Sequence, residues 1–144
     1  MTIRRTCGAF AAATAIVLAT SAAGAHAKAK PPKDAVGQCF WIKNDCIGEA
    51  RFEWDGDDMW VVDARNNGWG VGAKIQTDYG KVRWCTTFKG KNVWHECRFN
   101  HREYTCVRWR MYEMKGQRVR YASPRWSPWY HTAYGNEVSP EYCR

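Results

Sequence analysis

The amino-acid sequence predicts an all-β domain, a small antiparallel β-sandwich or open barrel with three disulfides. Three observations lead to this fold class. From about residue 37 onward, short runs of alternating apolar and polar residues are separated by closely spaced turn signals, which is typical of sandwiches and barrels. No stretch of this part repeats apolar residues at helical spacing. Its six cysteines are an even number, as a disulfide framework requires.

The first 27 residues are typical of a cleavable secretory signal. Arg4 and Arg5 give a positive start, residues 9–23 are uncharged and mostly apolar, and Ala25 and Ala27 place small residues at the cleavage site. This run is too short and too rich in alanine for a good transmembrane helix, and no later segment is apolar enough for one. We therefore expect a secreted, extracellular protein. The arginine pair leaves both the general and the twin-arginine export route open.

The remaining chain is expected to form a flexible leader at residues 28–36 and a single β domain at residues 37–144. The leader is rich in Lys, Pro and Ala, which favours an irregular segment. Because Arg4 and Arg5 leave with the signal and no acid does, 20 basic and 14 acidic residues stay, a net charge of +6. This charge favours an anionic partner without specifying one.

The strands follow from local patterning. Phe52 and Trp54 alternate with charged residues, residues 55–58 are a turn signal, and residues 59–62 are apolar again, which predicts a β-hairpin. Further strands are marked by residues that share one parity: Trp69, Val71, Ala73 and Ile75; Val82, Trp84 and Phe88; Val93, His95, Cys97 and Phe99; and Val107, Trp109 and Met111. From Ser123 onward three prolines favour irregular structure, with at most one edge strand near residues 134–138.

The cysteines are expected to form disulfides, because Cys7 leaves with the signal and no closely spaced pair of a metal site is present. We favour Cys85–Cys97, since both residues flank a tight turn on neighbouring strands. The pairs Cys39–Cys46 and Cys106–Cys143 then follow by elimination. The alternative is a Cys97–Cys106 bond across a turn at residues 101–102.

The nine tryptophans are the most unusual feature of the composition. Strand parity places Trp54, Trp69, Trp84 and Trp109 in the core. The candidate binding residues lie instead in the irregular segment, where exposure is easier, and are Arg125, Trp126, Trp129 and Tyr130. Exposed aromatic rings of this kind stack on sugar rings or on nucleic-acid bases. The alternative is that these rings only cover the core.

The later half of the chain also concentrates arginine. A basic, aromatic face would favour acidic polymers, whereas the plainer interpretation is the solvated side of strands with Arg stacked on Tyr. The residues concerned are Arg98, Arg102, Arg108, Arg110, Arg118, Arg120 and Arg125, with Tyr104, Tyr112 and Tyr121.

No motif fixes a reaction. His101, Arg102 and Glu103 resemble pieces of a small ribonuclease site, but neighbours on an extended chain point to different faces. The acidic turn at residues 55–58 lacks the spacing of a calcium loop. A nucleophile elbow, a phosphate loop and a zinc-type histidine pair are all missing. The sequence thus predicts no catalytic residue, no metal and no cofactor.

Residues 52–63 and 68–71, followed by the pair Cys85 and Cys97, resemble a group of small secreted β-rich proteins from Gram-positive bacteria. In that group a strand, a Gly-Asp turn, a strand ending in Asp and a second tight turn recur before two cysteines about a dozen residues apart. The group has no assigned activity. The resemblance therefore implies export and an all-β fold and adds no site.

These observations favour a secreted, non-catalytic binding or interaction domain. The ligand classes that fit are an anionic or carbohydrate polymer, chiefly polysaccharide, and another secreted protein. A secreted inhibitor or antimicrobial effector is the alternative, because a rigid, basic, disulfide-braced domain suits both roles. A small hydrolase such as a ribonuclease is less favoured, since no catalytic constellation is visible.

Overall fold

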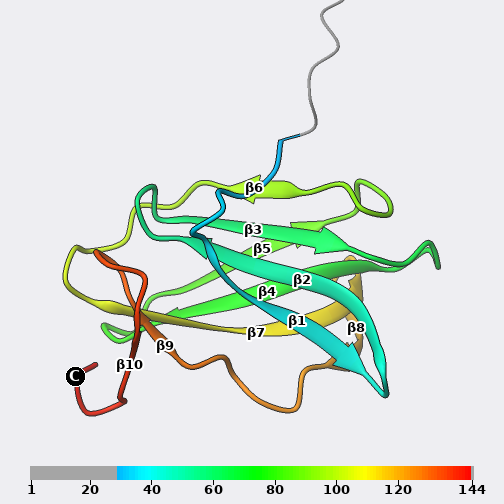
Figure 1. Ribbon diagram of the computed structural model, residues 1–144. Helices are drawn as coiled ribbons and strands as arrows, with labels where there is room; N and C mark the ends of the chain where they lie inside the picture. Colours follow the sequence, from blue (N-terminus) through cyan, green and yellow to red (C-terminus); the bar gives the residue numbers. More distant parts are fainter. Residues whose placement is uncertain (1–28, 144) are drawn as a thin grey trace, which may run out of the picture.

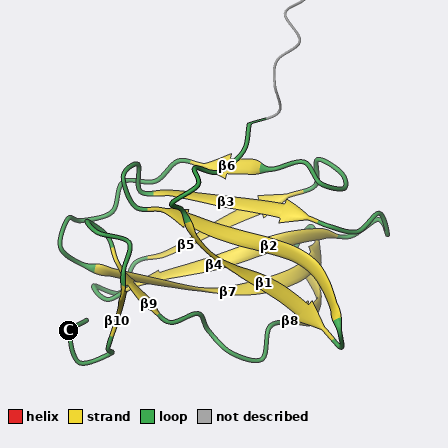
Figure 2. Cartoon of the chain, viewed as in Figure 1, coloured by secondary structure: helices red, strands yellow, loops and turns green. Residues whose placement is uncertain are grey.

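The computed structural model describes residues 29–143, and every regular element in this range is a β-strand (Figure 1, Figure 2). The predicted signal, residues 1–27, lies outside the described residues, as does Arg144. The described range contains no helix that is suited to cross a membrane. The strands are β1 (Val36–Ile42), β2 (Asp45–Glu53), β3 (Asp58–Asp63), β4 (Gly70–Thr77), β5 (Val82–Thr87), β6 (His95–Cys97), β7 (Cys106–Lys115), β8 (Arg118–Ala122), β9 (Trp129–His131) and β10 (Glu137–Val138).

The strands form two antiparallel sheets that do not close into a barrel. The small sheet has the order β1-β2-β3-β6, and the large sheet has the order β10-β9-β7-β4-β5. β8 also pairs with β7. β8 lies along the C-terminal end of β7, and β9 lies along the N-terminal end of β7 (Figure 1). The predicted all-β class is confirmed, and of the two predicted architectures the chain adopts the sandwich.

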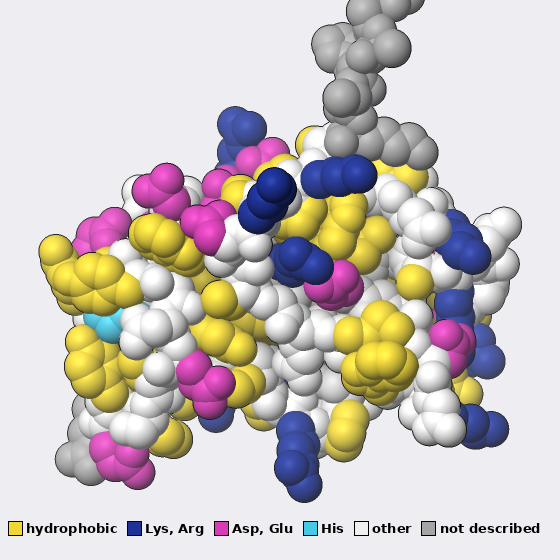
Figure 3. Space-filling model, in the orientation of Figure 1, with side chains coloured by type: hydrophobic (Ala, Val, Ile, Leu, Met, Phe, Trp, Pro, Cys, Tyr) yellow, Lys and Arg dark blue, Asp and Glu magenta, His cyan; other side chains and the backbone are white. Residues whose placement is uncertain are grey.

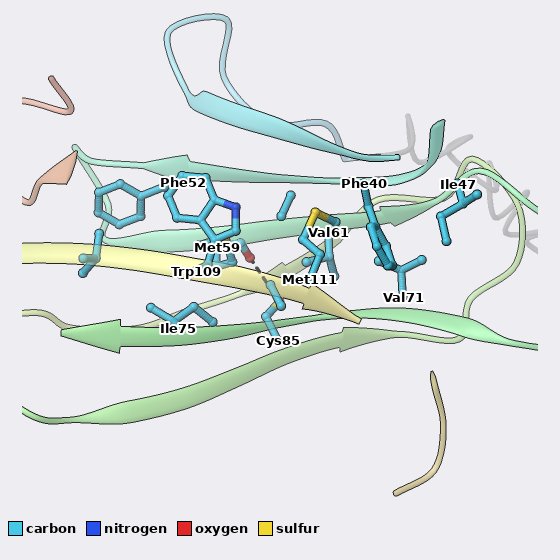
Figure 4. Close-up of a cluster of buried hydrophobic side chains, with 13 residues drawn as sticks. Phe40, Ile47, Phe52, Met59, Val61, Val71, Ile75, Cys85, Trp109 and Met111 are labelled. Carbon is cyan, nitrogen blue, oxygen red and sulfur yellow. Dashed lines mark hydrogen bonds between the residues drawn. The ribbon is translucent and has the colours of Figure 1, made fainter. Parts of the chain in front are cut away.

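The core lies between the two sheets (Figure 4). Its largest side chains are fully buried and come from both sheets: Phe40, Ile47, Phe52, Met59 and Val61 from the small sheet, and Val71, Ile75, Val107, Trp109 and Met111 from the large sheet. The parity predicted for β4 and β7 is therefore confirmed. Each such side chain contributes about 1.5–3 kcal/mol through burial.

Three disulfides close the structure in the pairing that the sequence favours. Cys85–Cys97 joins β5 of the large sheet to β6 of the small sheet, with a Cα–Cα distance of 5.7 Å. Cys39–Cys46 links β1 to β2, and Cys106–Cys143 ties the C-terminal tail to β7. The alternative bond between Cys97 and Cys106 is not formed. Such bonds indicate an oxidising setting.

The core prediction for the tryptophans is correct only in part. Trp109 is fully buried, and Trp54 and Trp69 are half-buried. The core prediction for Trp84 is wrong, because its side chain is 45% exposed on the outer face of the large sheet. On β5 the inward parity belongs to Cys85, which bonds to the other sheet, so Trp84 points away from the core.

The tail is more regular than the prolines suggest. The edge strand predicted near residues 134–138 is present as β10, but β9 comes in addition and pairs with both β10 and β7. Between β8 and β9 the chain stays attached to β7 through two buried serines. The Oγ atoms of Ser123 and Ser127 accept the backbone N–H groups of Met111 and Trp109 at 3.1 and 2.9 Å. The backbone N–H groups of the same serines donate to the carbonyl oxygens of Met111 and Trp109 at 2.8 and 2.7 Å, so side-chain and backbone groups together replace the missing strand pairing.

Replacing Trp109 by Ala is expected to lower the free energy of unfolding by about 3–5 kcal/mol, because a large cavity would open in the core. Trp84→Ala should cost about 1 kcal/mol or less, since that ring is nearly half exposed. Urea unfolding followed by far-UV circular dichroism compares the two variants. Equal losses would contradict the placement of these rings on opposite faces of the large sheet.

Loss of the Cys106–Cys143 bond should destabilise the domain more than loss of Cys39–Cys46. The sequence separations are 37 and 7 residues, and the chain-entropy model assigns about 4 kcal/mol to the longer loop and about 2.5 kcal/mol to the shorter one. Paired Cys→Ala variants in the same unfolding assay measure the difference. A larger loss from the shorter loop would show that closure of the tail loop contributes little.

Candidate functional site

The candidate site is an open hollow on the outer face of the large sheet, where β7, β9, β10 and the segment before β9 meet. Its volume is about 900 Å³, in the range of small-molecule sites. Its lining consists of Arg108, Arg125, Trp126, Ser127, Pro128, Trp129, Glu137, Val138, Ser139 and Pro140. Three of the four predicted binding residues, Arg125, Trp126 and Trp129, are therefore brought together here.

Arg108 organises this hollow. Its guanidinium lies 4.8 Å from the ring centroid of Trp126 and 4.5 Å from that of Trp129. Its Nε and Nη2 donate hydrogen bonds to Oε1 of Gln76 on β4, at 3.1 and 2.9 Å. Cation–π contacts with two rings and two hydrogen bonds fix the arginine in place. The two indole rings are thereby held in a defined arrangement before any ligand arrives.

Strand pairing explains why the two ring-bearing segments meet Arg108. Val107 pairs with Tyr130 across β7 and β9, so Arg108 and Trp129 share the outer face of the sheet. Trp126 precedes Ser127, whose hydrogen bond with Trp109 keeps this segment beside β7. The sequence shows Arg108 on the outward parity of a strand, but it does not show that this strand lies beside residues 126–129. The sequence accordingly indicates Arg108 only as one member of a general basic face, and Gln76 is missed.

The fourth predicted binding residue, Tyr130, does not line the hollow. Its ring stacks on the buried Trp109 at a centroid distance of 5.1 Å and packs against the core. Alternation on β9 sends Tyr130 inward when Trp129 faces outward. Burial raises the pKa of the Tyr130 phenol, and the charge of Glu137 adds to this.

The trio His101, Arg102 and Glu103 does not converge on one point. His101 is 4% exposed, and its ring meets the edges of Phe52 and Phe99. The guanidinium of Arg102 lies over the Tyr79 ring at 4.7 Å, and Glu103 is exposed. Neither ring nitrogen of His101 has a hydrogen-bond partner among residues 29–143. This imidazole is packed as an apolar ring.

The other two histidines of the described range lie on different sheets. His95 is on β6 of the small sheet, and His131 is on β9 of the large sheet. His131 is buried, its Nδ1 accepts the N–H of Ala133 at 3.1 Å, and its Nε2 lies 3.1 Å from the Tyr142 hydroxyl. These contacts hold the tail in place beside β9.

The acidic turn before β3 is a structural element. Oδ2 of Asp57 accepts the N–H of His101, and Oδ1 of Asp58 accepts the N–H of Phe99, both at 3.1 Å. Burial and the neighbouring Glu96 raise the pKa of Asp58 to about 6. Within the described part of the chain no group of three or more metal-ligating side chains is found. The turn therefore anchors the segment that leads from β6 towards β7.

Comparison with protein-family models, with curated proteins and with solved structures finds no match. The resemblance to small secreted proteins of Gram-positive bacteria has no support from these comparisons and stays a prediction. The arguments about function below are drawn from the geometry of this chain.

Burial of His101 should make the stability of the domain depend on pH. Burial, with the charges of Arg83 and Lys81, lowers the pKa of His101 from 6.5 to about 4. The unfolded chain then takes up a proton that the folded chain refuses, so stability present above pH 6.5 is lost as the pH falls towards 4. The loss is on the order of 3 kcal/mol.

His101→Phe keeps the ring packing and removes this proton. The free energy of unfolding of the wild type minus that of the variant should therefore fall between pH 7 and pH 4, as measured by urea unfolding at several pH values. Taking the difference removes the opposite contribution of Asp58, whose raised pKa stabilises the fold as the pH falls through 6. A difference that is independent of pH would show that His101 titrates normally.

Proposed function

We propose that this chain is a secreted, non-catalytic binding domain, that its ligand is a polysaccharide, and that the hollow around Trp126 and Trp129 is the binding site. The observation that carries the proposal is the fixed guanidinium of Arg108 between the two indole rings. A pair of rings that needs no rearrangement on binding loses little entropy when a ligand arrives.

The chemistry of the hollow suits sugar rings. The faces of indole rings carry partial negative charge and attract the C–H groups on the apolar face of a pyranose. Around these rings the hollow offers short polar groups, namely the carboxylate of Glu137 and the hydroxyl of Ser139. Apolar platforms with a few polar groups at their edge are the usual composition of small-molecule sites.

Secretion is supported by two independent features. The three disulfides are of a kind that persists in oxidising compartments. Residues 1–27 have the composition of an export signal. A domain outside the cell meets the polysaccharides of walls and surfaces as its most abundant polymers.

The test is retention on insoluble polysaccharides by sedimentation. We expect the mature domain to bind at least one of a set that includes cellulose, chitin and peptidoglycan sacculi. Trp126→Ala and Trp129→Ala should each weaken binding by about tenfold or more, as the removal of a central aromatic contact usually does. Both side chains are only half-buried, so both variants should fold, which circular dichroism verifies.

Trp94→Ala is the matched control. Trp94 is also half-buried and also lies under a guanidinium, that of Arg51 at 5.7 Å, but it belongs to the small-sheet side of the sandwich. Its removal should leave binding unchanged. Binding that is insensitive to Trp126 and Trp129, or an equal loss in all three variants, would overturn the proposed site.

A further inference from the structure

We infer that the polysaccharide is acidic, with carboxylates on its sugar rings, and that Lys74, Arg108 and Arg110 recognise these carboxylates. This inference rests on the proposed function and adds the chemical class of the ligand. It starts from an imbalance of charge on the outer face of the large sheet, next to the hollow.

The three cations are placed together by strand register. Lys74 on β4 is directly opposite Arg110 on β7, and the next outward pair along the same strands is Gln76 with Arg108. Lys74 is also paired with Trp84 on β5. The charged ends of this pair diverge, because Lys74 Nζ lies 6.0 Å from the ring centroid of Trp84 on β5, while Arg110 Nε donates to Ser123 beyond the other edge of β7. The outer face thus carries three cations on two neighbouring strands.

No carboxylate on the same strands offsets these charges. β4 and β5 contain no acidic residue, and the one acid of β7, Glu113, is buried. Glu113 accepts a hydrogen bond from Asn67 at 2.7 Å and lies 3.8 Å from Arg120. The ion pairs found within residues 29–143 involve other cations, which are Arg51, Arg65, Arg98 and Arg120.

Charges of both signs are present elsewhere on the molecule. On the face seen in Figure 3, several basic side chains lie beside acidic ones, while the one at the lower edge does not. Of the three cations, Arg108 lines the hollow, and the acid Glu137 of β10, at the far edge of the large sheet, lines it too. The cluster of Lys74, Arg108 and Arg110 is thus complementary to an anion.

The guanidinium of Arg110 is held in an orientation that leaves donors free for a carboxylate. Its Nε donates to the carbonyl oxygen of Ser123 at 2.7 Å, which fixes the guanidinium, and it lies 5.8 Å from the Tyr112 ring centroid. Its terminal Nη atoms donate no hydrogen bond within the described part of the chain. The end of a fixed guanidinium presents two parallel N–H groups, the geometry that a carboxylate accepts.

Aromatic rings lie on both sides of the cations. Trp126 and Trp129 are on the β9 side. On the β5 side lies Trp84, which contacts Tyr112 of β7 with ring centroids 5.1 Å apart. Three strand spacings separate β9 from β5, about 14 Å in all. A linear polymer lying across the sheet would therefore reach both pairs of rings and pass over the cations between them.

The ratio of rings to charges favours an acidic polysaccharide over single-stranded nucleic acid. With Arg125 of the hollow, the face offers four rings and four cations. A nucleic-acid binder that makes about 6–10 phosphate contacts needs more cations than these. In a polymer of uronic acid, one sugar ring supplies both an apolar face for stacking and a carboxylate for Arg110.

The experiment compares soluble polygalacturonate with its carboxyl-reduced form, which keeps the linkages and lacks the charge. Affinity electrophoresis of the mature domain should show binding to the acid form and at least about tenfold weaker binding to the reduced form, as charged hydrogen bonds are lost. Lys74→Gln and Arg110→Gln should each weaken binding to the acid form about tenfold.

Arg51→Gln is the control, because it removes the same charge from the small sheet and should leave binding unchanged. Equal binding of the acid and reduced forms, with dependence on Trp126 and Trp129, would overturn the acidic class and keep the proposed site. Binding of neither form would overturn the inference, and the sedimentation assay then decides the proposed function separately. Tighter binding of single-stranded oligonucleotides than of polygalacturonate would also overturn it.

Discussion

Most of this structure depends on the hydrogen bonding of one strand, β7. Along one edge it pairs with β4 over eight residues. Along the other edge, β7 forms hydrogen bonds with β8, then with the hydroxyls of Ser123 and Ser127, and then with β9. A buried strand must satisfy its backbone polar groups along its whole length. That requirement draws the C-terminal third of the chain, prolines included, onto the large sheet.

The alternation of β7 then separates stability from recognition. Its inward side chains, Trp109 and Met111 among them, fill the space between the sheets. Its outward side chains, Arg108 and Arg110, organise the aromatic rings and carry the charge of the outer face. Because neighbouring residues of a strand point to opposite faces, one segment serves both purposes without conflict. The proposed binding surface is consequently built on a strand that is hydrogen-bonded along both edges.

The sequence predicts the local part of this arrangement well. Period-two patterning identifies the strands and the inward faces of β4 and β7, and turn chemistry identifies the hairpin between β2 and β3. The sequence-based prediction fails where a residue's direction or pairing depends on a segment far away in the sequence. Trp84 faces outward because Cys85 bonds to Cys97 on the other sheet. β9 forms because β7 has an unpaired edge nearby, and Arg108 joins the site because β9 lies there. None of these causes is visible within the segment concerned.

The bond between Cys106 and Cys143 encloses the segments that bear Arg108, Trp126 and Trp129 within one covalent ring. A protease that cuts the exposed turn between β7 and β8, at Gly116 for example, would open the chain without releasing either piece. The fragment with β8, β9 and β10 would stay attached at Cys106, still hydrogen-bonded to its neighbours. In surroundings where proteases are common, such a domain keeps Arg108, Trp126 and Trp129 in one covalently linked unit after a backbone cut.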